Sequence, residues 1–159
     1  MSSIKNYLSP LFIFTLFFAS QICSIAQDSL NISVYKNINR GDTRYSGSWA
    51  YIDSLGNEYA LIGARTGLAA YSIDDTSSIE LGFIPGPNSN WREITVVGTH
   101  AYVTTEGAGE GEGLQIIDLS YLPDSLHLRG TYSETFTRGH ILQRDIYTNE
   151  PYILSLIHI

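Results

Sequence analysis

The sequence predicts an all-β protein built from a repeated four-stranded unit. After the N-terminal region, no helical periodicity is sustained over the chain. Short runs rich in β-branched and aromatic residues alternate instead with Gly, Pro, Asn, Asp and Ser. These runs occur twice in the same order, and strand-rich repeats of this kind exclude a helical array.

The N-terminal segment has the pattern of a secretory signal peptide. Lys5 precedes an apolar run from Leu8 to Ser20, and small residues occupy the positions three and one before Gln27. We therefore expect residues 1–26 to be removed by cleavage after Ala26. The alternative is lipidation at Cys23, but bulky Ile22 stands where a lipoprotein signal favours a small residue. Residues 27–45 are expected to lead into the first repeat.

Residues 46–153 contain the repeats. The predicted strands are WAYID, EYALIGA, GLAAYSI and IELGFI, and then REITVV, HAYVTT, GLQIIDL and LHLRGTY. Three pairs of residues align the two copies: Trp49 with Trp91, Tyr59 with Tyr102, and Gly67 with Gly113. A third copy begins near His140, where GHILQRDIYTNEPYI resembles the start of the second.

A four-stranded unit that recurs every 40 to 45 residues or so is typical of a β-propeller blade. Two blades and the start of a third make about two and a half. Propellers usually have about four to eight blades, because each sheet needs a neighbour on both faces and the ring must close. The sequence therefore predicts an incomplete ring, the N-terminal part of a longer protein.

The last six residues, 154–159, read LSLIHI. This peptide resembles the translation of an adapter sequence used to tag sequencing libraries, so we expect it to be an artefact of a truncated gene sequence. The alternative is an ordinary strand. His158 is given no role for this reason.

The segment GLQIIDLS resembles the core of the LVIVD repeat. Together with FIPGPNSNWREI and HAYVTTEG, it makes residues 49–153 similar to the choice-of-anchor B family of exported bacterial proteins. The resemblance implies a secreted or cell-surface β-propeller whose membrane association depends on a C-terminal anchor. It is weaker in the first blade, and it implies no catalytic residues.

Composition limits the partners. Loss of the signal removes Lys5 and no acid, so the formal net charge changes from −7 to −8 and Lys36 is the remaining lysine. An acidic chain is a poor ligand for nucleic acid or an anionic membrane. The mature chain has no cysteine, so it can form neither a disulfide nor a zinc–thiolate site. We expect an unidentified protein or glycan as the partner.

The loop EGAGEGEG supplies three carboxylates, Glu106, Glu110 and Glu112, on a glycine-rich backbone. Calcium prefers clustered oxygen ligands, so a calcium site is one interpretation. The corresponding loop of the first repeat, GARTG, has no acid. The other interpretation is a solvated hairpin loop in which the glycines form the turn. Asp118, at the end of the next strand, is expected to bind turn amides.

The candidate ligand-binding residues are Trp49, Trp91, Arg92 and His140, which open the successive repeats. By fold analogy the first strand of a propeller blade faces the central channel, where an indole can stack and a guanidinium can bind carboxylates or sugars. The alternative is that the tryptophans pack between blades and Arg92 pairs with a neighbour.

These observations favour a non-enzymatic, exported interaction or ligand-binding module. No Gly-x-Ser-x-Gly elbow is present, and the histidines of the repeats have no metal-binding spacing. Whether the protein is an enzyme stays open. A propeller-fold hydrolase or lyase, with its catalytic residues in further blades, is the alternative function.

Overall fold

The computed structural model describes residues 34, 36–41, 44–73 and 79–154. Apart from Val34, these belong to one unit, Lys36–Ile159. In the described residues the chain forms strands and no helix, so no helix there could cross a membrane. The predicted signal peptide, residues 1–26, lies outside the described residues, as do Asp74 and residues 155–159.

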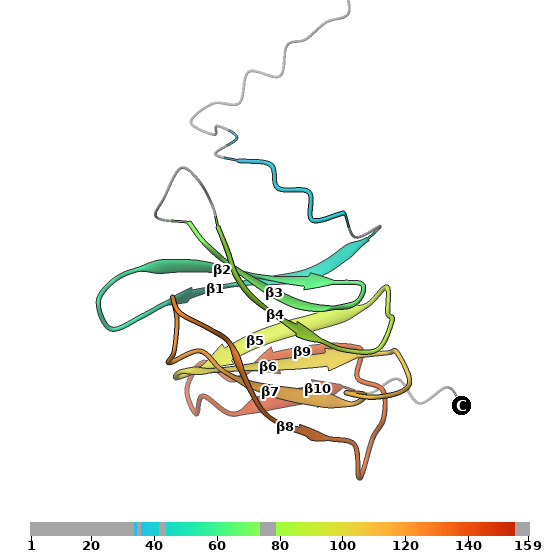
Figure 1. The fold of residues 1–159 in the computed structure, drawn as a ribbon. Helices are drawn as coiled ribbons and strands as arrows, with labels where there is room; N and C mark the ends of the chain where they lie inside the picture. Colours follow the sequence, from blue (N-terminus) through green and yellow to red (C-terminus); the bar gives the residue numbers. More distant parts are fainter. Residues whose placement is uncertain (1–33, 35, 42–43, 74–78, 155–159) are drawn as a thin grey trace, which may run out of the picture. The chain divides into compact units, whose positions relative to one another are not determined.

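The strands form two four-stranded antiparallel sheets and one hairpin (Figure 1). The first sheet has the order β1-β2-β3-β4 and the second β5-β6-β7-β8, while β9 pairs with β10. The strands of the first sheet are β1 (Tyr45–Ile52), β2 (Glu58–Ala64), β3 (Gly67–Ser72) and β4 (Glu80–Pro85). Those of the second are β5 (Arg92–Val97), β6 (His100–Thr105), β7 (Leu114–Asp118) and β8 (His127–Tyr132), followed by β9 (Ile141–Arg144) and β10 (Pro151–Leu154).

The all-β prediction is confirmed, and the eight predicted strands of the two repeats all occur. Each follows the local pattern of apolar side chains ended by turn residues. The β1–β2 turn shows the chemistry: Asp53 Oδ1 accepts hydrogen bonds from the amides of Leu55 and Asn57 at 2.8 and 2.9 Å. Gly56 adopts a φ of 88°, which glycine adopts without strain. Leu154, predicted to begin the trailing artefact, is the last residue of β10.

Both four-stranded sheets contain the same irregularity. The register of β3 and β4 shifts between Ala70 and Tyr71, just after Ala70 pairs with Gly82. The register of β7 and β8 shifts between Ile116 and Ile117, just after Ile116 pairs with Gly130. Counting from these matched bulges makes Leu68 equivalent to Leu114, as the predicted match of Gly67 with Gly113 requires.

The predicted match of Trp49 with Trp91 is wrong. Trp49 pairs with Leu61, and Leu61 pairs with Ala70. The equivalent path through the second sheet leads from Ile116 to Tyr102 and on to Thr95. Thr95 is therefore the counterpart of Trp49, and Leu61 rather than Tyr59 that of Tyr102. The β1–β2 connection spans residues 53–57 but the β5–β6 connection only residues 98–99, so linear spacing does not preserve register.

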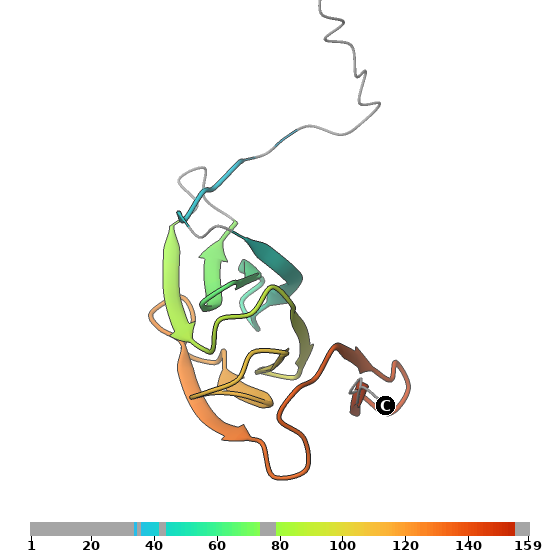
Figure 2. The same cartoon turned by 90° about the vertical axis from the view of Figure 1, so that its right-hand side faces the viewer.

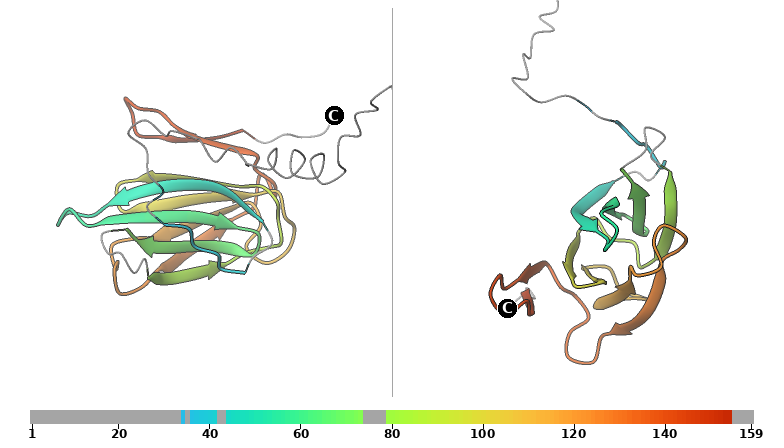
Figure 3. Two further views of the ribbon diagram at one scale, coloured as in Figure 1. Left: turned by 90° about the horizontal axis from the view of Figure 1, so that it is seen from above. Right: turned by 90° about the vertical axis from the view of Figure 1, so that its left-hand side faces the viewer.

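The core lies between the two four-stranded sheets. Leu61, Leu68 and Ala70 of the first sheet are buried in one cluster with Ile94, Val103 and Ile117 of the second. Strand β1 lies beside β5, and β5 beside β9, so the first strands of the three units are neighbours (Figure 2 and Figure 3, right). The ends of these strands therefore bring together residues far apart in the sequence.

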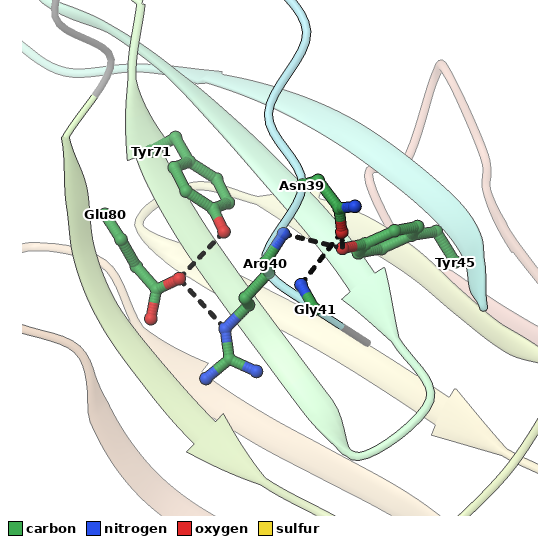
Figure 4. Close-up of polar contacts among 6 residues, drawn as sticks. All are labelled: Asn39, Arg40, Gly41, Tyr45, Tyr71 and Glu80. Carbon is green, nitrogen blue, oxygen red and sulfur yellow. Dashed lines mark hydrogen bonds and ion pairs between the residues drawn. The ribbon is translucent and has the colours of Figure 1, made fainter. Parts of the chain in front are cut away.

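The segment before β1 packs on the first sheet through Arg40 (Figure 4). Its Nε lies 2.9 Å from Glu80 Oε2, and its guanidinium carbon lies 3.7 Å from the centre of the Phe83 ring. Tyr71 donates its hydroxyl to the same Glu80 oxygen at 2.8 Å. Burial, and then this hydrogen bond, raise the pKa of the Tyr71 phenol. One carboxylate thus joins the lead-in to β3 and β4.

The end of β7 is fixed by Asp118, which is 5% exposed. Its Oδ1 accepts hydrogen bonds from the amide and the hydroxyl of Ser120 at 2.9 and 2.6 Å. These bonds, the hydroxyl bond first, lower the pKa of the Asp118 carboxyl. The predicted role of Asp118 in the turn is confirmed.

Arg40→Ala should lower the free energy of unfolding by about 1 kcal/mol, because it removes a partly exposed ion pair and a cation–π contact. Urea denaturation measures the change. Arg44→Ala, which removes the same charge from an exposed neighbouring residue, should have almost no effect. Equal losses in both variants would show that Arg40 acts through net charge alone.

Asp118→Asn should make stability less sensitive to acid. Since the folded-state pKa of Asp118 is lowered, its contribution is complete above the unfolded-state value of about 4 and is lost as pH falls further. The melting temperature of the wild type should thus fall more steeply than that of the variant below about pH 4. Asp124→Asn, at an exposed position in the following turn, is the control; parallel curves for Asp118→Asn and the wild type would contradict the assignment.

Candidate functional site

Three side chains from three parts of the chain meet where β5, β6 and β9 lie close together. The ring centres of Trp91 and His140 lie 5.9 Å apart at an interplanar angle of 62°. His140 Nδ1 and Glu106 Oε1 are 2.5 Å apart. We call Trp91, Glu106 and His140 the tryptophan cluster.

The backbone positions this cluster. Trp91 directly precedes β5, Glu106 follows β6 and His140 precedes β9. The amide of Glu106 donates to the carbonyl of Trp91 at 3.5 Å, and the amide of His140 donates to the carbonyl of Leu154 at 3.2 Å. Pairing of β5 with β6, and the closing bond of the β9–β10 hairpin, therefore bring the three residues to one place.

Ser89 fixes the approach to Trp91. Its hydroxyl donates to the carbonyl of Trp91 at 2.7 Å and accepts from the Trp91 amide at 3.1 Å. Ser89 is 8% exposed, whereas Trp91 is 54% exposed. The turn is therefore anchored inside while the indole remains open to solvent.

The cluster offers complementary chemistry to a ligand. An exposed indole presents a flat apolar face for stacking. Glu106 and His140 each expose about a third of their side chains, at 32% and 33%. With a carboxylate as acceptor, His140 donates from Nδ1, and this bond leaves Nε2 for a ligand.

The prediction that Arg92 presents its guanidinium at an open channel is wrong. The side chain is fully buried, at 0% exposure. Its Nε donates to the carbonyl of Ala64 at 3.1 Å, and its Nη2 donates to the carbonyl of Pro87 at 2.7 Å. Burial lowers the pKa of Arg92 to about 10, so the group is still a cation at neutral pH. Arg92 instead joins the second sheet to the end of β2 and to the β4–β5 loop.

Trp49 does not complete a repeated ring of tryptophans. It lies within β1 opposite Leu61 and is 38% exposed. Its counterpart in the second sheet, Thr95, is fully buried. The two tryptophans therefore occupy different environments, and of the four predicted ligand-binding residues the structure brings together Trp91 and His140.

The acidic loop directs its three carboxylates to different places. Glu106 pairs with His140, and Glu112 Oε2 accepts the amide of Gly109 at 2.9 Å. Glu110 lines a pocket between this loop and the β4–β5 loop. Within the described ranges, no group of three or more His, Cys, Asp or Glu side chains is arranged to hold a metal ion. The loop therefore does not gather its glutamates around one point.

Sequence reasoning missed the pairing of Glu106 with His140, which are 34 residues apart. It assigned Glu106 to a metal site and His140 to the channel. The one available signal was that both residues adjoin predicted strands: Glu106 follows HAYVTT, and His140 opens the third repeat. Ser89 and Gln115 were also missed, because single polar residues in a repeat carry no spacing pattern.

Arg92→Met should lower the free energy of unfolding by roughly 2–4 kcal/mol, because it leaves two buried carbonyl groups without donors. Chemical denaturation measures the loss. Arg129→Met is the control, since Arg129 is 60% exposed and its Nε lies 3.5 Å from Asp118. A loss no larger than that of the control would show that the bonds of Arg92 do not hold the two sheets together.

Comparison with known proteins adds nothing to the description of the candidate site, which therefore depends on the geometry given above. No family model matches the chain, and searches of curated proteins and of solved structures likewise return no match. The likeness to LVIVD-repeat proteins therefore rests on the quoted residues.

Proposed function

We propose that this protein is an exported β-propeller protein that binds a protein or glycan ligand at the cell surface or outside the cell. The tryptophan cluster is its contact site, and binding involves no reaction. The observation that carries the proposal is the exposed Trp91 indole beside the Glu106–His140 pair. Large exposed aromatic side chains beside polar groups are typical of binding hot spots.

The sheet geometry supports a propeller. The two successive four-stranded meanders each contain a bulge at the equivalent position. Their first strands, β1 and β5, lie side by side, and β9 lies beside β5. In a propeller, each blade covers the apolar face of its neighbour. On the β9–β10 hairpin, Leu142 is buried, whereas Tyr152 and Leu154 on the other face are 52% and 59% exposed. That face has the character of a surface between blades.

Export and the partner class are supported by the sequence. The pattern of residues 1–26 and the likeness of GLQIIDLS to the LVIVD repeat both agree with a secreted or surface-anchored bacterial protein. The negative net charge disfavours nucleic acid.

A second candidate function, that of a hydrolase or lyase, is favoured by one observation. An imidazole oriented by a carboxylate is a common general base, and Glu106 and His140 have this arrangement. The test is to assay the protein against a panel of glycoside and ester substrates. Turnover that the wild type shows and Glu106→Gln loses would mean that the function is catalysis rather than binding.

The binding function is tested by screening the purified protein against glycans, peptides and cell-wall fragments, followed by titration of the best ligand. Trp91→Ala should weaken binding about tenfold or more, since a stacking surface is lost. Trp49→Ala is the matched control, because it removes a partly exposed indole outside the cluster. Equal affinity of Trp91→Ala and the wild type would exclude the tryptophan cluster as the contact site.

A further inference from the structure

A second potential site is the pocket between the β4–β5 and β6–β7 loops. Its volume is about 520 Å³, within the range of about 300–1,000 Å³ typical of small-molecule sites. Edge strand β8 forms another wall. The lining residues that carry the argument are Pro87, Ala108, Glu110, Gln115, Leu128 and Thr131.

Gln115 is a buried polar group that belongs to this pocket. It comes from β7 and is 1% exposed. Its Nε2 donates to the carbonyl of Pro85 at 2.9 Å, which fixes the orientation of the amide. Its Oε1 has no hydrogen-bond partner. A buried acceptor without a donor costs about 1–3 kcal/mol, so a donor group would stabilise it.

Two glycines pack against this amide, and a side chain at either position would crowd it. A Cβ at Gly111 would lie 2.9 Å from Gln115 Nε2. A Cβ at Gly86 would lie 3.1 Å from Gln115 Oε1 and 2.8 Å from Arg92 Nη1. Arg92 Nη1 is also a buried atom without a partner. A donor and an acceptor that lack partners thus converge on the small space beside Gly86.

This pairing selects the chemistry of the ligand. A hydroxyl group can accept from Arg92 Nη1 and donate to Gln115 Oε1, which neither a carboxylate nor an ammonium can do. Glu110 adds a carboxylate that accepts from further hydroxyls. The unpartnered donor and acceptor together therefore favour a neutral, hydroxyl-bearing ligand. Pro87, Ala108 and Leu128 add apolar surface for C–H groups.

We propose that the pocket formed by Gln115, Glu110 and the β4–β5 loop binds a neutral saccharide through its hydroxyl groups. The inference rests on the proposed ligand-binding function. It names a class of ligand and a second set of residues, outside the tryptophan cluster, that would bind it. The tryptophan cluster is adjacent along the chain, since Glu106 and Glu110 belong to the same loop.

The test is titration of the purified protein with cellotetraose, maltotetraose, xylotetraose and chitotetraose. Each saccharide is added up to ~10 mM, a concentration that covers the dissociation constant of a weak single site. NMR follows the side-chain amide signal of Gln115, and calorimetry gives the affinity. At least one saccharide should shift this signal saturably. Glucosamine and glucuronic acid serve as charged comparisons for glucose, and both should bind more weakly than glucose.

Two variants avoid the buried residues. Glu110→Gln should weaken binding roughly three- to tenfold, because glutamine keeps an acceptor oxygen but loses the charge that makes the hydrogen bond about twice as strong. Thr131→Tyr, at an exposed edge-strand position, should fill the pocket and abolish binding. Glu134→Gln removes the same charge from an exposed residue outside the pocket and should bind like the wild type.

Three results would overturn the inference. No shift of the Gln115 signal with any of the four saccharides would show that the pocket does not bind them. Binding that survives Thr131→Tyr but is lost in Trp91→Ala would place the ligand at the tryptophan cluster, so that the proposed function stands and the pocket is excluded. Tighter binding of glucosamine than of glucose would contradict the neutral class.

Discussion

The arrangement of the two sheets depends on the buried guanidinium of Arg92. It binds the carbonyls of Ala64 and Pro87 in place of a carboxylate, and burial of a cation is tolerated only when its hydrogen bonds compensate for lost hydration. The backbone of Arg92 also meets β1 closely: Ser46 donates its hydroxyl to the Arg92 carbonyl at 3.1 Å, and a Cβ at Gly47 would overlap that oxygen. One residue therefore sets the approach of β1 to β5 and the course of the β4–β5 loop.

The same loop shapes both candidate sites. Arg92 holds the carbonyl of Pro87, Gln115 holds that of Pro85, and Ser89 fixes the turn into Trp91. The β6–β7 loop packs against it closely, since a Cβ at Gly107 would lie 2.6 Å from the carbonyl oxygen of Asn88. Rigid strands thus position two short loops whose side chains are available to ligands, a common arrangement in binding proteins.

The eight predicted strands were confirmed because their signals are local, although β1 begins at Tyr45, four residues before the predicted run WAYID. Short apolar runs mark β2 and β6, and turn residues such as Gly56 and Gly98 mark the ends. The sites were predicted less well. Trp91 and His140 do come together, but Arg92 is buried and Trp49 lies elsewhere, because residue type and spacing do not report register. The glycine-rich acidic loop illustrates the same limit, since its glutamates point to three different places.

The sequence by itself determined the all-β class, the order of the strands and the repetition of a four-stranded unit, since these depend on side-chain periodicity and turn chemistry along the chain. The tertiary structure decided the register between strands, the burial of Arg92 and the pairing of Glu106 with His140. These depend on contacts between segments that are far apart in the sequence, such as the 46 residues between Ser46 and Arg92, and a charged residue's environment is fixed only when those segments pack. Packing therefore turned a predicted ligand-binding arginine into the link between two sheets.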